Sequence, residues 1–211
     1  MRIEKIIEKL NKIYNFRLRR EDPFRLLITT VLSQRTKDEV TEQAASRLFK
    51  VAKRPEDFLR LKEKDLAKLI YPVGFYRQKA KNIRKLCRLL VGKGLPKDRE
   101  SMMELPGVGS KTASIVLAYG FGIPTIAVDT HVNRISQRLG LVEEGSKPEE
   151  TQKVLERMVP RRMQVLVNHL FVSFGKDVCK PLRPQCFRCP IKEYCRYYHR
   201  SGQKGISTVE S

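Results

Sequence analysis

Apolar residues recur at helical spacing along nearly the whole of this 211-residue chain, and this periodicity restricts the fold more than any other feature. One stripe consists of Ile3, Ile6, Ile7, Leu10 and Ile13, and the next of Phe24, Leu27, Ile28 and Val31. Residues three and four apart lie on one face of an α-helix, so each stripe predicts a helix with one buried face. The one short apolar run, 125–128, cannot be assigned by periodicity, and nothing alternates like a half-buried strand. We therefore predict an all-α fold.

Several residues that favour helix ends mark boundaries. Asp22 before Pro23 predicts an N-cap, and Thr36 with Glu39 has the spacing of a capping box. Glycine can adopt the left-handed conformation that closes a helix, and four glycines follow predicted helices: Gly92, Gly120, Gly140 and Gly175. The polar tail from Ser201 is expected to fray.

Basic residues outnumber acidic ones widely, with 43 Lys and Arg against 23 Asp and Glu and a formal charge of +20. Such a surface attracts a polyanion, so nucleic acid is the first partner to consider. Acidic membrane lipid would also suit the charge, but no apolar run approaches the roughly 20 residues of a spanning helix. We therefore predict a nucleic-acid partner and no membrane.

The beginning of the chain, MRIEKIIEKL, mixes charged and apolar residues and lacks the apolar stretch of a secretory signal. We expect a reducing cytoplasm, where disulfides rarely persist. The five cysteines are thus poor disulfide candidates. Cys87 lies on an apolar helical stripe and is interpreted as an inert core residue.

Four cysteines, Cys179, Cys186, Cys189 and Cys195, stand within seventeen residues, separated by six, two and five others. Thiolates at such spacing suit either zinc or an iron–sulfur cluster. Zinc sites usually pair two short C-x-x-C hairpins, and only one is present here, so the spacing favours iron–sulfur. Basic residues lie between the ligands at Lys180, Arg183 and Arg188. We interpret the site as a structural staple that also stiffens a basic loop against phosphate.

Gly107, Val108, Gly109 and Ser110 form a glycine-rich turn between two helical stretches, one ending near residue 105 and one spanning 110–119. This pattern predicts a helix-hairpin-helix, whose free backbone N–H groups can approach a phosphate closely. A Walker-type loop is the rival interpretation. It requires glycine directly before the lysine, whereas Ser110 intervenes before Lys111.

Lys111 falls in the first turn of the second helix, where the helix dipole disfavours positive charge. That position suits an attacking amine, which must be neutral to form a Schiff base. A phosphate contact is the plainer alternative. Asp129 likewise has two interpretations, since it opens a helix as a natural N-cap and could also support glycosidic cleavage as an ionised carboxylate. His131 has a weaker case, because a histidine in a first turn is usually a hydrogen-bonding surface residue.

The segments 105–113 (LPGVGSKTA) and 128–131 (VDTH), followed by the cysteine spacing, resemble the endonuclease III family. Weaker likeness at 23–27 (PFRLL) and 31–34 (VLSQ) extends the resemblance over nearly the whole chain. It implies two all-α lobes with DNA bound between them. Residues 17–124 would form a six-helix barrel with the hairpin, and residues 1–16 with 125–211 an iron–sulfur lobe.

By the same resemblance the chain is a bifunctional DNA glycosylase and abasic-site (AP) lyase of base excision repair, acting on oxidised pyrimidines in duplex DNA. Lys111 would be the nucleophile and Asp129 its support, and the four cysteines would hold a 4Fe-4S cluster. Gln34 or Arg35 would fill the gap left by a flipped base, and Phe75, where the family usually has leucine, would be the wedge. DNA contacts would also come from the hairpin, Lys180 and Arg183. We expect a nucleoid-associated monomer whose partner is double-stranded DNA with damaged or abasic nucleotides.

Two other functions fit the same composition. One is a monofunctional mismatch glycosylase, a branch of the superfamily that lacks the lysine nucleophile. The other is a non-catalytic module whose hairpin and basic loop only clamp phosphates. Lys111 as a nucleophile distinguishes the bifunctional glycosylase and lyase from both alternatives.

Overall fold

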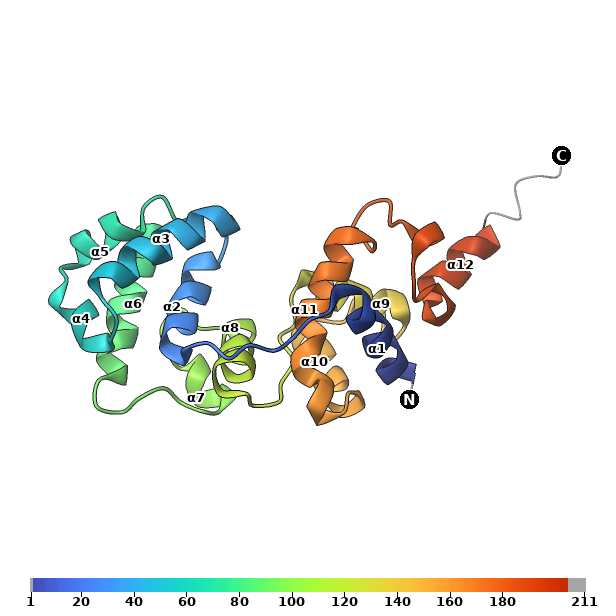
Figure 1. The fold of residues 1–211 in the computed structure, drawn as a ribbon, viewed down its shortest axis with the longest axis horizontal. Helices are drawn as coiled ribbons and strands as arrows, with labels where there is room; N and C mark the ends of the chain where they lie inside the picture. The colour runs from blue at the N-terminus through green and yellow to red at the C-terminus, as the bar shows by residue number, and fades with distance from the viewer. Residues whose placement is uncertain (1, 205–211) are drawn as a thin grey trace. The chain divides into compact units, whose positions relative to one another are not determined.

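The computed structural model describes residues 2–204, with side chains through Arg200, and in this part of the chain every regular element is a helix. The all-α prediction is therefore confirmed. Two compact units are present, one within Met1–Leu18 and Pro124–Ser211 and the other formed by Arg19–Ile123 (Figure 1). None of the described helices combines the length and apolar character that crossing a bilayer requires.

The contiguous unit is built around a core of fully buried aliphatic and aromatic side chains, including Leu27, Ile28, Leu48, Phe58 and Ile83. Helix α2 packs against α3, α6 and α8, and α6 packs against α4 and α5. The helices are α2 (Pro23–Ser33), α3 (Asp38–Val51), α4 (Pro55–Arg60), α5 (Glu63–Ile70), α6 (Tyr76–Leu90), α7 (Arg99–Met103) and α8 (Ser110–Ile115), continued by a π-helical segment, Val116–Phe121.

The discontinuous unit joins the two ends of the chain. Helix α1 buries Ile3, Ile6, Ile7 and Leu10 against α11, whereas Ile13, expected on the same stripe, is 53% exposed. Its helices are α1 (Arg2–Tyr14), α9 (Thr130–Leu139), α10 (Pro148–Met158), α11 (Arg161–Asp177) and α12 (Arg196–Lys204), with single 3₁₀ turns at Cys186–Arg188 and Lys192–Tyr194. The tail expected to fray is helical as far as Lys204, and its remainder lies outside the described residues.

Three of the residues predicted to mark helix ends are confirmed. Asp22 accepts a hydrogen bond from the Arg25 N–H at 2.7 Å, and Gly92 and Gly140 have positive φ angles of 74° and 69° after α6 and α9. The capping box at Thr36 is wrong, because α3 begins at Asp38 after Lys37 and the Thr36 hydroxyl has other partners.

Two of the predicted glycine caps are also wrong, because close packing, and not a helix end, explains these glycines. Gly120 lies inside the π-helical segment, where a Cβ would be 3.0 Å from Pro23 Cβ. Gly175 lies inside α11, where a Cβ would be 2.5 Å from His131 Nδ1. The long helix expected over 110–119 ends instead at Gly122, which has a φ of 69°.

Candidate functional site

The hairpin between α7 and α8 has the geometry that the glycine pattern predicts. Gly107 has a φ of 84°, and a Cβ there would lie 3.1 Å from Asn82 Nδ2, so both backbone and space favour glycine. The Val108 N–H donates to the Leu105 carbonyl at 3.0 Å and closes the turn. Gly109 is the N-cap of α8, and its carbonyl accepts the Ala113 N–H at 2.9 Å.

Lys111 occupies the first turn of α8, and its side chain is exposed. The next residue, Thr112, is buried, and its hydroxyl accepts a hydrogen bond from the Gln34 amide at 3.2 Å. The same Gln34 amide donates to the Gly107 carbonyl at 3.0 Å. Gln34 is therefore fixed on the hairpin that carries Lys111, although the two lie far apart in sequence.

The structure also brings Arg35 close to Phe75. Arg35 and Phe75 both have left-handed backbones, with φ angles of 52° and 57°. The Arg35 guanidinium carbon lies 5.6 Å from the centre of the Phe75 ring, and 64% of Phe75 is exposed. An aromatic side chain this exposed, at a strained backbone position, is a candidate contact for a ligand.

Asp129 is the N-cap of α9, in the other unit. Its Oδ1 atom accepts the backbone N–H groups of His131 and Val132, each at 2.9 Å. Those bonds fix the carboxylate at the positive end of the helix, where an ionised side chain is favoured. His131 packs closely against Gly175, and its Nδ1 lies 3.2 Å from Arg134. This position supports a packing role for His131.

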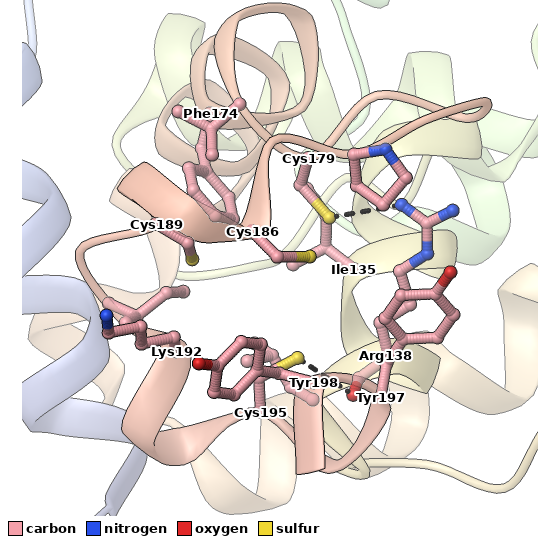
Figure 2. Close-up of a pocket in the computed structure, with 14 residues that line it drawn as sticks. Ile135, Arg138, Phe174, Cys179, Cys186, Cys189, Lys192, Cys195, Tyr197 and Tyr198 are labelled. Carbon is pink, nitrogen blue, oxygen red and sulfur yellow. Dashed lines mark hydrogen bonds between the residues drawn. The ribbon is translucent and has the colours of Figure 1, made fainter. Parts of the chain in front are cut away.

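The four clustered cysteines line one pocket, and their sulfur atoms face the space between them (Figure 2). Cys179 follows α11, and the other three lie in or beside the two 3₁₀ turns. The remaining walls are largely apolar and include Ile135, Phe174, Val178 and Ile191. All five cysteines are free, and within residues 2–204 no three His, Cys, Asp or Glu side chains form a ready site for a metal ion.

Partial burial affects three of these thiols. It raises the pKa of Cys189 to about 11, and it also raises the pKa of Cys186 and Cys195. Arg138 is a positive group at this pocket, and its guanidinium donates to Cys179 Sγ at 3.3 Å and to the Lys180 carbonyl at 2.7 Å. A cationic iron core would offset the cost of ionising such buried thiols.

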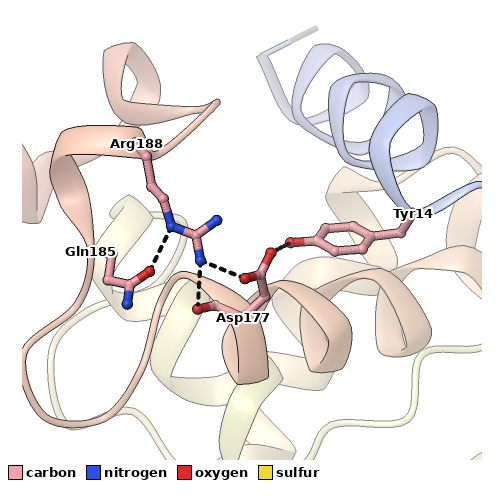
Figure 3. A network of polar contacts seen from close by, with 4 residues as sticks. All are labelled: Tyr14, Asp177, Gln185 and Arg188. Carbon is pink, nitrogen blue, oxygen red and sulfur yellow. Dashed lines mark hydrogen bonds and ion pairs between the residues drawn. The ribbon is translucent and has the colours of Figure 1, made fainter.

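A polar network ties the cysteine loop to the first helix (Figure 3). Asp177 at the end of α11 pairs with Arg188 at 2.5 Å and accepts a hydrogen bond from the Tyr14 hydroxyl at 3.0 Å. Arg188 also donates to the Gln185 side chain at 2.6 Å. The hydrogen bond from Arg188, followed by that from Tyr14, holds the pKa of Asp177 below its usual value. Arg188 thus has a structural partner, and it is exposed like Lys180 and Arg183.

Sequence reasoning missed two residues that organise these sites. Arg138 was not singled out, although it stands one helical turn after Arg134 on the helix that Asp129 opens. Lys79 is buried in the contiguous unit and bonds to the Gln34 segment. Its spacing could have revealed it, because it lies three and four residues before Asn82 and Ile83, and Ile83 belongs to the buried stripe of α6.

Comparison with known proteins places the chain in a class and then in a family. Residues 28–161 match the HhH-GPD superfamily of base excision DNA repair proteins. The chain is 45% identical to endonuclease III of Thermotoga maritima over 204 residues, which cover 95% of each protein. A solved structure described as a trapped endonuclease III–DNA covalent intermediate has a TM-score of 0.85 and 36% identity, over 95% of this chain and 97% of that one.

The chain therefore belongs to the endonuclease III family, and it is a DNA glycosylase and lyase of base excision repair. A thermostable thymine-DNA glycosylase has the same fold, with a TM-score of 0.82 at 24% identity over 94% of this chain and 97% of that one.

Proposed function

We propose that this enzyme removes oxidised pyrimidines from duplex DNA with Lys111 as its nucleophile, and then cleaves the strand by β-elimination. The observation that carries the proposal is the position of Lys111: an exposed amine in the first turn of α8, directly after the hairpin turn. A lysine that served only as a phosphate contact would be poorly placed here, because the helix dipole disfavours its positive charge.

The chemistry breaks three bonds of the nucleotide in turn. The Lys111 amine attacks C1′ of the damaged nucleotide, the N-glycosidic bond breaks, and the base leaves with the bonding electron pair and takes up a proton. The C1′–O4′ bond then breaks, O4′ takes up a proton while the amine releases one, and a Schiff base is left between Lys111 and C1′ of the opened sugar. Loss of a C2′ proton breaks the C3′–O bond and releases the 3′ phosphate, after which water frees the lysine.

Asp129 supports the first step in this proposal. A carboxylate held in place by two backbone N–H groups can stabilise the positive charge that develops on the sugar or accept a proton from the attacking amine. The N-cap role is compatible with that function, because capping uses Oδ1.

The target base must leave the helix, at a cost of about a few kcal/mol that is smaller for damaged bases. We assign gap filling to Gln34 or Arg35 and the wedge to Phe75. Backbone groups of Gly107, Val108, Gly109 and Ser110 would hold phosphate without reading sequence. Lys180 and Arg183 would add a second phosphate contact.

For the cofactor we propose a 4Fe-4S cluster held by Cys179, Cys186, Cys189 and Cys195. Four thiols that face one space with largely apolar walls fit that donor set. The cluster would supply a scaffold for the loop with Lys180 and Arg183. No chemical step on the nucleotide is assigned to it.

Borohydride trapping tests the nucleophile. Borohydride reduces a Schiff base to a stable amine, so protein incubated with duplex containing one oxidised pyrimidine should give a covalent adduct. The adduct should be absent from Lys111→Ala and present in Lys153→Ala, which removes an exposed lysine of α10. Base release without an adduct would indicate a monofunctional glycosylase. Binding with neither product would indicate a non-catalytic module.

A further inference from the structure

Lys79 is the most deeply buried charged side chain of the contiguous unit, with 6% of its surface exposed. Its ammonium donates three hydrogen bonds, to the Leu32 carbonyl at 2.8 Å, to the Gln34 carbonyl, and to Thr36 Oγ1 at 3.2 Å. All three acceptors are uncharged. Burial lowers the pKa of Lys79 to about 8, which shows how strongly its surroundings penalise the charge.

The acceptors lie where α2 ends. The backbone leaves the helix at Gln34, so carbonyls of the last turn lose their partners within the helix. A buried carbonyl without a donor is destabilising, and a cation near a helix C-terminus is favoured by the helix dipole. Lys79, which lies on α6, therefore caps the C-terminus of α2. It thereby fixes the backbone that carries the Gln34 and Arg35 side chains.

The same group of contacts reaches the turn before α6. Thr36 Oγ1, which accepts from Lys79, also accepts the Gly74 N–H at 3.1 Å. A Cβ at Gly74 would lie 2.5 Å from the Arg35 carbonyl oxygen, so the two backbones are in direct contact. The Lys79 N–H in turn bonds to the Phe75 carbonyl at 3.0 Å.

We propose that Lys79 is a positioning residue that holds two segments as one rigid element: Gln34–Arg35, and the turn before α6 that contains Gly74 and Phe75. The gap-filling residue and the wedge would then enter the DNA at the same base step. This inference rests on the proposed function, because it assigns a task to the residues placed there against DNA. It assigns no contact between Lys79 and DNA.

The test compares Lys79→Met, which keeps the length of the side chain but removes its donors, with Lys81→Met, an exposed lysine on the same helix. Binding is measured to a duplex containing a tetrahydrofuran abasic analogue and to the same duplex undamaged. Fluorescence of 2-aminopurine opposite the analogue reports insertion of the gap filler. Misplacement by about 1 Å costs roughly 100-fold where geometry is decisive, so Lys79→Met should lose about 10- to 100-fold in preference for the abasic duplex and lose the fluorescence change. Lys81→Met should keep both.

A purely structural role predicts a different pattern. The core variant Ile83→Val lowers stability within the same helix, and it should leave the preference for the abasic duplex unchanged. If Lys79→Met folds and keeps the wild-type preference, the positioning role is wrong while the proposed function stands. If the wild type itself shows no preference and no borohydride adduct, the proposed function fails first. Should Lys79→Met not fold, Thr36→Val decides, because it removes the shared hydroxyl: loss of preference supports the proposal, and retention overturns it.

Discussion

The Gln34 side-chain amide donates a hydrogen bond to the hydroxyl of Thr112, the residue directly after Lys111. The amide also bonds to the Gly107 carbonyl, so it reaches both sides of the hairpin turn. Gln34→Ala should therefore loosen the hairpin and remove a candidate gap filler together. We expect lower turnover on a lesion duplex and a stability loss of about 1 kcal/mol.

Thr112→Val provides the matched control, because it removes the same hydrogen bond and leaves Gln34 in place. Single-turnover rates and urea denaturation of both variants separate the two contributions. If turnover falls equally in both, the hydrogen bond, and not gap filling, explains the effect.

Asp129 can be tested by separating its charge from its cap. Asparagine also caps helices well, whereas Ala costs about 1 kcal/mol at this position. We expect Asp129→Asn to keep the stability of the wild type but to lose turnover far more than DNA affinity. Asp129→Ala should lose both stability and turnover. Comparable losses of turnover and affinity in Asp129→Asn would leave only the capping role.

Removal of the proposed cluster should unfold the loop around the four cysteines and weaken binding to duplex DNA. Without the metal core, nothing bridges the four partly buried thiols across the pocket, so the loop loses the contacts that hold it folded. Limited proteolysis of cluster-free protein should cut within 179–195, and Cys87→Ala, outside the pocket, should behave as the wild type. Wild-type DNA affinity in cluster-free protein would contradict the stiffening role.

The lowered pKa of Lys79 predicts how the free energy of unfolding depends on pH, with a definite sign. Its pKa is about 8 in the folded chain, below the ordinary 10.5. Between these values the unfolded chain binds more protons at this position, so the contribution of Lys79 to stability rises with pH. The free energy of unfolding of the wild type minus that of Lys79→Met should increase from pH 8 to 10.5 and be constant below about pH 7. Urea denaturation across this range measures it, and a difference that does not vary with pH would show an ordinary pKa.

Salt dependence measures the phosphate contacts. A plot of the logarithm of the DNA association constant against the logarithm of salt concentration should have a slope of roughly −0.9 for each neutralised phosphate. Lys180→Ala and Arg183→Ala should each reduce that slope by about 1. Lys153→Ala should leave it unchanged. Equal slopes for all four proteins would remove the cysteine loop from the DNA interface.

Local signals in the sequence were sufficient wherever a residue acts on its own neighbours. Asp22 and Asp129 cap the helices that directly follow them, so their positions alone predicted the bonds. The Gly107 position likewise requires glycine for its own positive φ. Helix spacing predicted the buried face of α1 for the same reason.

Distant partners explain the failures. Thr36 has the spacing of a cap, but its hydroxyl bonds to Gly74 and Lys79, about forty positions away in sequence. Gly175 lies inside α11, and His131 on another helix leaves no room for a Cβ there. A periodic pattern shows that Lys79 faces inward, yet only the fold shows which carbonyls it meets.

The pairing of α1 with α11 has a consequence for synthesis of the chain. Translation releases the apolar face of α1 first, but its packing partner, Arg161–Asp177, is made roughly 150 residues later. The unit Arg19–Ile123 is contiguous and can fold in the interval, as domains generally fold as units during translation. We therefore expect the nascent protein to expose the apolar face of α1 until α11 has emerged, which makes α1 a candidate substrate for ribosome-associated chaperones.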